Sequence, residues 1–141
     1  MLPIEATKFD TQAGWKVLNL NQNGSWRFLL DEVAQKHLRD MIKSTFEKDR
    51  PIFDYHADEF DLGPAHAPIT AAVEMAHHKL GIALLSGLPH NDVSEKEFEL
   101  LNWAIGLQTG VARPQGIATQ YISQVRDIGT DYRAKTGRGY S

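Results

Sequence analysis

The chain has 141 residues, the length of one ordinary domain, and 42% of them are hydrophobic, which is enough to build a core. The 15 Lys and Arg against 18 Asp and Glu leave a net charge of −3, so we expect no nucleic-acid partner. Since there is no cysteine, disulfides, thiolate metal sites and cysteine nucleophiles are excluded. Without a bilayer-spanning stretch or a signal-peptide layout, we expect no membrane partner and a cytoplasmic protein.

The first elements predicted along the chain are two short strands and a helix. Trp15–Leu20 alternates large apolar and polar residues, and Trp26–Leu30 is expected to return as a second strand after the turn-forming segment Asn21–Ser25. The two strands would form a hairpin. Asp31 is expected to cap a helix that ends near Asp49, because a proline two residues later disfavours its continuation.

The middle of the chain predicts a loop, a helix and a buried strand. Phe53–Ala67 has no apolar period and is expected to be an extended loop. Pro68–Leu80 has a helical apolar stripe, with Gly81 suited to the position after the helix. The short apolar run Ile82–Leu85 is typical of a buried strand.

The clearest helix is predicted to begin after Ser94, which forms a capping box with Glu97, and to end at Gly106 or Gly110. Its expected apolar face consists of Phe98, Leu101 and Ile105, with Leu100 and Ala104 on the margins. Ala118–Val125 alternates and predicts another strand. Three helices and a few short strands make an α+β fold class, with a sheet too small to be a full layer.

Two His-x-Asp pairs have the spacing of a 2-His-1-carboxylate iron site. They are His56 with Asp58 and His90 with Asp92. One metalloenzyme hypothesis joins His56 and Asp58 to a third histidine, such as His90 or His66. About 0.8 such pairs are expected by chance in this composition, so solvated loop histidines are the favoured interpretation.

Other polar residues give weaker signals. His77 and His78 are adjacent on a predicted helix and point in different directions, so they cannot share one metal ion. Arg113–Gly116 and Val125–Asp127 lie beside predicted strand ends, where sites are often built. A turn and an exposed ion pair remain the alternative interpretation of these two segments.

The order of several short motifs resembles the N-terminal portion of the TauD/TfdA family of Fe(II)- and 2-oxoglutarate-dependent dioxygenases. The resemblance covers the chain from about Trp15 to Ser141. The motifs are Asp58–Leu62, Ile82–Pro89, the helix from Ser94, Pro114–Gly116, Val125–Gly129 with Asp131 and Tyr132, and Arg138–Tyr140.

The resemblance implies a double-stranded β-helix, or jelly roll, wrapped by helices. Residues 1–141 would be one incomplete domain of it, the helix-rich part with an unfinished sheet. The iron-binding His-x-Asp pair, the distal His and the Arg that holds 2-oxoglutarate would all lie beyond Tyr140. No catalytic, metal or cofactor-binding residue is therefore expected in this chain. The resemblance places Gln115, and with it Arg113, near the substrate.

The leading hypothesis is accordingly the N-terminal part of an oxidoreductase that hydroxylates a small organic substrate, inactive by itself. Iron and 2-oxoglutarate would serve the complete enzyme only. The alternative is a non-catalytic binding or assembly subunit derived from that fold. If the chain is whole in nature, a second copy or a partner chain is expected to cover unpaired strand edges at Ile82–Leu85 or Ala118–Val125.

Overall fold

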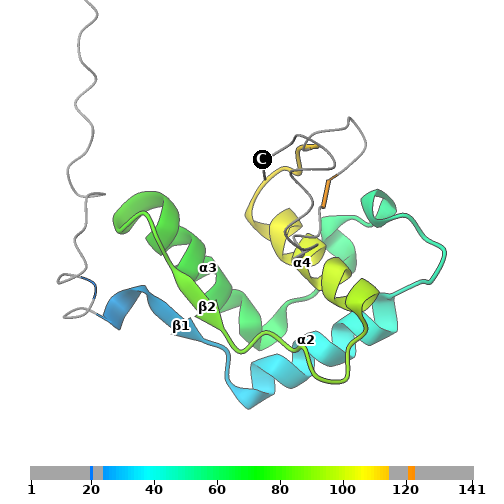
Figure 1. The fold of residues 1–141 in the computed structure, drawn as a ribbon, viewed down its shortest axis with the longest axis horizontal. Helices are drawn as coiled ribbons and strands as arrows, with labels where there is room; N and C mark the ends of the chain where they lie inside the picture. The colour runs from blue at the N-terminus through cyan, green and yellow to red at the C-terminus, as the bar shows by residue number, and fades with distance from the viewer. Residues whose placement is uncertain (1–19, 21–23, 115–120, 123–141) are drawn as a thin grey trace, which may run out of the picture.

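A computed structural model of the chain describes residues 20, 24–114 and 121–122 (Figure 1). Three α-helices and a small parallel sheet form its regular part. In chain order the elements are η2 (Gly24–Trp26), β1 (Arg27–Leu29), α2 (Glu32–Thr45), η3 (Ile52–Asp54), η4 (Ala57–Glu59), η5 (Gly63–Ala65), α3 (His66–Glu74), the π-helical turn η6 (Met75–Lys79), β2 (Leu84–Ser86) and α4 (Glu95–Thr109).

The two strands pair in parallel although they lie far apart in sequence. Arg27 is level with Leu84 and Leu29 with Ser86, and the Leu30 N–H donates to the Ser86 carbonyl at 2.9 Å. Helices α2 and α3 belong to the long connection that a parallel pair requires. In Figure 1 β1 and β2 run side by side next to α3, which contacts both strands.

This pairing was not predicted, and most of the predicted hairpin falls outside the described residues. β1 lies within the predicted Trp26–Leu30 strand, but its partner in the described part of the chain is β2. Residues 15–19 of the other predicted strand lie outside the described residues, and Leu20 has helical backbone. An apolar pattern indicates a strand, whereas the strand that it pairs with depends on the packing of the whole chain.

Helix α2 begins where the sequence predicts. Asp31 accepts a hydrogen bond from the Ala34 N–H at 2.8 Å, which confirms its capping role. The helix ends at Thr45 rather than near Asp49. Phe46, the next residue, has an extended backbone, and its partly buried side chain packs against the core.

The segment Phe53–Ala67, predicted to be an extended loop, instead contributes buried side chains to the core. It folds into the three short 3-10 helices η3, η4 and η5. Its apolar side chains are spaced without a helix or strand period, yet four of them are buried, namely Tyr55, Phe60, Leu62 and Ala65. The prediction was wrong because successive short turns bury residues without regular spacing.

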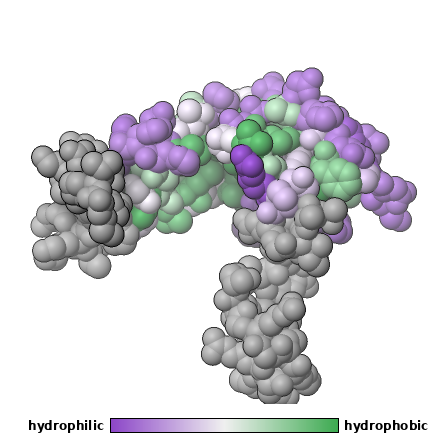
Figure 2. Space-filling view, turned by 90° about the horizontal axis from the view of Figure 1, so that it is seen from above, coloured by the Kyte–Doolittle hydropathy of each residue, from purple (hydrophilic) through white to green (hydrophobic). Residues whose placement is uncertain are grey.

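The core is formed where these turns meet the helices. Its other members are Leu30, Ala34, Leu38, Ile42, Ile69, Leu100, Leu101, Trp103 and Ala104. Hydrophilic residues dominate much of the outer margin in Figure 2, while hydrophobic residues gather in the middle of the described part. The core therefore joins α2, α3 and α4 through the irregular segment between α2 and α3.

Helix α4 has the predicted capping box. Ser94 Oγ accepts from the Glu97 N–H at 3.2 Å, and the Glu97 carboxylate accepts from the Ser94 N–H at 2.6 Å. The helix ends at Thr109, and Gly110 is its C-cap residue, as one of the two predicted ends has it. Its fully buried residues are Leu100, Leu101, Trp103 and Ala104. The predicted Leu101 is buried, and the predicted Phe98 and Ile105 are partly buried and pack against the core. Trp103 is the buried residue of this helix that the apolar spacing did not predict.

The segment from α3 to β2 follows the prediction with shifts of two residues. α3 starts at His66, before Pro68, and Gly81 has the expected positive φ of 78°. The strand is shifted to Leu84–Ser86, and Leu84 is 48% exposed instead of buried. The predicted strand 118–125 lies outside the described residues apart from 121 and 122, which have no regular secondary structure.

Candidate functional site

The predicted substrate-binding residues lie just after α4. Arg113 is exposed in the chain that follows Gly110, and Gln115 lies outside the described residues. An exposed guanidinium at this position is available to a ligand. The predicted juxtaposition of Arg113 and Gln115 therefore stays a prediction.

The two His-x-Asp pairs do not assemble. His56 and Asp58 are both exposed, at the start of η4. His90 is also exposed, with Nδ1 3.3 Å from the Leu88 carbonyl oxygen, and so is His66 at the start of α3. In the described part of the chain no three His, Cys, Asp or Glu side chains are arranged to hold a metal ion. The metalloenzyme hypothesis on His56, Asp58 and His90 or His66 therefore finds no support.

The adjacent histidines 77 and 78 lie in the π-helical turn that ends the third helix. Both are exposed, and their ring centroids are 6.0 Å apart with the planes inclined by 50°. This agrees with the prediction that they point in different directions. Their side chains are surface groups of η6.

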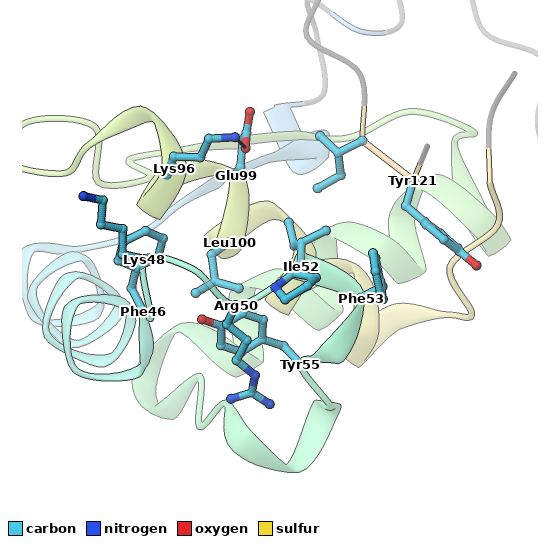
Figure 3. Close-up of a pocket in the computed structure, with 12 residues that line it drawn as sticks. Phe46, Lys48, Arg50, Ile52, Phe53, Tyr55, Lys96, Glu99, Leu100 and Tyr121 are labelled. Carbon is cyan, nitrogen blue, oxygen red and sulfur yellow. Dashed lines mark hydrogen bonds and ion pairs between the residues drawn. The ribbon is translucent and has the colours of Figure 1, made fainter. Parts of the chain in front are cut away.

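A groove of about 430 Å³ lies between the chain that follows α2 and the start of α4 (Figure 3). It is lined by Phe46, Lys48, Arg50, Pro51, Ile52, Phe53, Tyr55, Lys96, Glu99, Leu100, Tyr121 and Ile122. In Figure 3 the Arg50 guanidinium points away from Lys48 and Lys96, which lie at the opposite margin. The groove thus combines an apolar floor with cationic side chains at its edges.

Arg50 lines this groove and makes polar contacts with three nearby residues. Its Nη1 lies 2.7 Å from Glu59 Oε1 and 3.1 Å from Glu47 Oε1. Nη2 donates to Glu59 Oε2 at 2.9 Å and to the Asp54 carbonyl at 2.7 Å. The guanidinium carbon also lies 4.0 Å from the centroid of the Tyr55 ring, in cation–π distance. Through these contacts Arg50 links the turns η3 and η4.

The ion pair changes the acidity of both partners. The hydrogen bond from Arg50 lowers the pKa of the Glu59 carboxyl below its ordinary value of 4.5, and the His56 backbone N–H adds to this effect. The Glu59 carboxylate in turn raises the pKa of Arg50. Both shifts favour the charged pair.

Helix α4 also donates hydrogen bonds to the irregular segment between α2 and α3. Trp103 Nε1 donates to the Tyr55 carbonyl at 3.3 Å. Gln108 Nε2 donates to the carbonyls of Ala57 at 2.9 Å and Phe60 at 3.4 Å. The backbone of the irregular segment therefore finds its hydrogen-bond partners on α4, which explains how a segment without regular structure is fixed in the core.

The described residues that line the groove are apolar or charged. Lys96 Nζ is 3.1 Å from Glu99 Oε2, Arg50 is paired with Glu59, and Lys48 is an exposed cation at the margin. The side chains that line it include no histidine, serine, threonine or cysteine. The arrangement is suited to packing or binding an apolar group.

Sequence reasoning missed this groove because three separate segments contribute to it. A signal that could have drawn attention to it is the mixture of aromatic and acidic residues after Arg50, which includes Tyr55 and Glu59.

No helix in the described part of the chain is long and apolar enough to cross a membrane. No protein-family profile matches the sequence. The chain is similar to a curated protein, FR-33289 synthase from Streptomyces rubellomurinus (strain ATCC 31215), with 24% identity over 127 residues. The similarity covers 89% of this chain but only 38% of the synthase. The chain thus spans well under half the length of the relative that it matches.

Proposed function

We propose that the chain forms the N-terminal, helix-rich part of an Fe(II)- and 2-oxoglutarate-dependent dioxygenase of the TauD/TfdA kind. The observation that carries the proposal is the similarity to a synthase over 89% of this chain and only 38% of the synthase, which is what a part of a longer enzyme would give. The order of motifs from Asp58–Leu62 to Arg138–Tyr140 supports the same family.

The described residues by themselves do not fit an iron site, because no three candidate ligands meet among them. Iron and 2-oxoglutarate are proposed only for the complete protein. In this proposal the α2–α3–α4 core is a support on which the substrate-facing loops and the rest of the sheet rest. The jelly roll likewise belongs to the complete protein, since the described sheet has two strands.

The substrate is proposed to contact Arg113 and Gln115. Arg113 is exposed directly after α4, whose C-terminal half is held by Trp103 and Gln108. A guanidinium and a carboxamide are suited to an oxygen-rich anionic or polar group on a small organic molecule. The rigid helix before them would give the loop a fixed starting point.

The direct test is the formation of succinate from 2-oxoglutarate by the complete protein, purified from its source and supplied with Fe(II). Substrate-independent succinate formation above that of a metal-free control is expected, together with an intact mass above that of 141 residues. With a turned-over substrate, Arg113→Ala should raise KM by roughly tenfold to a hundredfold, since it removes a charged hydrogen bond. Lys36→Ala, on the exposed side of α2, should leave KM unchanged.

The alternative proposal is a non-catalytic binding or assembly subunit, favoured by the apolar groove with its cationic margin. It predicts a protein with a cooperative thermal transition that neither Fe(II) nor 2-oxoglutarate shifts. Ligand binding to the native state raises the transition temperature, so an increase with both added would contradict this alternative.

A further inference from the structure

The groove between the chain that follows α2 and the start of α4 has a charged end and an aromatic end. In Figure 3 Lys48 and Lys96 lie toward one end. Phe53 and Tyr121 lie toward the other, with Ile52 between the two pairs. The volume of about 430 Å³ is within the range of small-molecule sites in proteins. The groove therefore has a direction, and an elongated ligand would lie along it with one end at the lysines.

The aromatic end exposes apolar surface on a fixed support. Phe53 is 53% exposed, although it lies in the turn η3. The Asp54 N–H donates to the Pro51 carbonyl at 3.0 Å, and the Asp54 carbonyl accepts from Arg50 Nη2 at 2.7 Å. These bonds hold the backbone that carries the Phe53 ring. Ligand sites are typically concave and lined by apolar and aromatic side chains, as this end of the groove is.

The opposite end offers a positive charge. Lys48 is exposed and forms no ion pair with any other residue that the structure describes. Lys96 Nζ is 3.1 Å from Glu99 Oε2, but the Lys96 side chain is 73% exposed, and exposed pairs contribute little. The charge of the Arg50 guanidinium is balanced by Glu59. Lys48 is therefore the cation that an incoming anion would meet first, with Lys96 at the same end.

We propose that this groove binds a small amphipathic organic anion, with its acidic head at Lys48 and its apolar body along Ile52 toward Phe53. Charge complementarity supports this occupant, because the described lining carries three basic side chains and one acidic side chain, on a chain whose net charge is −3. The proposal goes beyond both proposed functions, since neither assigns a ligand to the groove. A neutral apolar molecule and another segment of polypeptide are the competing occupants.

The direct test compares hydrocinnamate with its neutral amide, hydrocinnamamide, because the two share an aromatic body and differ in charge. Each is titrated into the complete protein, and binding is measured by ligand-observed NMR. The acid is expected to bind roughly threefold to tenfold more tightly than the amide at low ionic strength. The difference should shrink as salt is added, because salt screens the charge of an exposed lysine.

Two substitutions locate the bound ligand. Lys48→Gln should raise the Kd of hydrocinnamate by roughly threefold to tenfold and leave that of the amide unchanged. Phe53→Ala should weaken the binding of both ligands, since it removes apolar contact area that they share. The matched controls are Lys79→Gln and Leu29→Ala, at an exposed cation and an exposed apolar residue outside the groove. Because all four side chains are exposed, the variants are expected to fold.

Three outcomes would overturn the proposal. Equal binding of the acid and the amide would show that the charged end recognises no anion. Saturable binding that neither Lys48→Gln nor Phe53→Ala weakens would place the ligand elsewhere. An absence of saturable binding at millimolar concentration would assign the groove to the packing of polypeptide. Succinate formation tests the proposed function separately, and either result of that assay is compatible with ligand binding in the groove.

Discussion

Arg50 and Glu59 form a two-point ion pair, with Nη1 2.7 Å from Oε1 and Nη2 2.9 Å from Oε2. The pair joins the chain that leaves α2 to the turn η4, nine residues later. Its parallel geometry gives it more directional strength than a single exposed contact. It is the central polar contact of a segment in which sequence periodicity indicates no structure at all.

Removing the charge of Glu59 should loosen this segment. Glu59→Gln keeps the shape but loses the charged pair and weakens the acceptor for the His56 N–H, so the urea midpoint at neutral pH should fall. The control is Asp40→Asn, which breaks the exposed pair of Asp40 with Lys36 on α2 and should change the midpoint less. A larger effect at Asp40 would contradict the role given to Arg50 and Glu59.

The same pair sets a pH dependence. The pKa of Glu59 is lowered in the folded protein, chiefly by Arg50, and that of Glu97 is lowered chiefly by the Ser94 N–H. A lowered folded-state pKa contributes stability that is present above the ordinary value of 4.5 and is lost as the pH falls below it through the folded value. Urea unfolding should therefore show stability falling below pH 4.5, with a shallower fall in Glu59→Gln and Glu97→Gln. A slope unchanged in both variants would assign the acid sensitivity to other groups.

The N-cap of α4 should contribute measurably to stability. Ser94→Ala removes the acceptor of the Glu97 N–H and should cost about 1 kcal/mol of unfolding free energy. Ser94→Asp, another good N-cap residue, should retain most of it. Ser44→Ala is the matched control, since the exposed Ser44 Oγ donates to the Met41 carbonyl near the end of α2 and caps no helix N-terminus. Equal losses from both alanine variants would refute the capping contribution.

Two glycines should respond to alanine in opposite directions. Gly63 has a φ of +49°, and a Cβ there would lie 2.5 Å from His37 Nε2, so Gly63→Ala should destabilise by roughly 1–3 kcal/mol. Gly106 lies within α4 with nothing within 4 Å of a Cβ, so Gly106→Ala should stabilise by about 0.5–1 kcal/mol. Thermal unfolding of both variants measures the difference, and a neutral Gly63→Ala would show that His37 moves aside.

Trp103 should matter for both packing and hydrogen bonding. Its side chain is buried and donates to the Tyr55 carbonyl. Trp103→Phe should cost about 1–3 kcal/mol, because it leaves that carbonyl unpaired and removes ring volume. Trp103→Ala should cost about 3–5 kcal/mol. Val111→Ala, at a side chain that is 84% exposed, should change stability little, and a comparable loss there would point to a general effect on the end of α4.

The sequence alone determined the features that depend on residues close together in the chain, such as helix ends. Asp31 and Ser94 cap helices because an oxygen three residues before a free backbone N–H can bond it whatever the rest of the chain does. Gly81 follows a helix because it tolerates a positive φ. The order of motifs resembles the N-terminal part of a family of oxidoreductases, and the proposed function rests on that resemblance.

Only the tertiary structure determined which strands, helices and turns contact one another. The partner of β1 is a strand more than fifty residues away. Trp103 joins the buried face of α4 although the apolar spacing did not include it. The segment after α2 is fixed by Arg50 and by hydrogen bonds to α4. Each of these outcomes depends on contacts between residues distant in sequence. Their energies do not appear in any local pattern, because pairing, burial and ion-pair geometry arise when the whole chain packs.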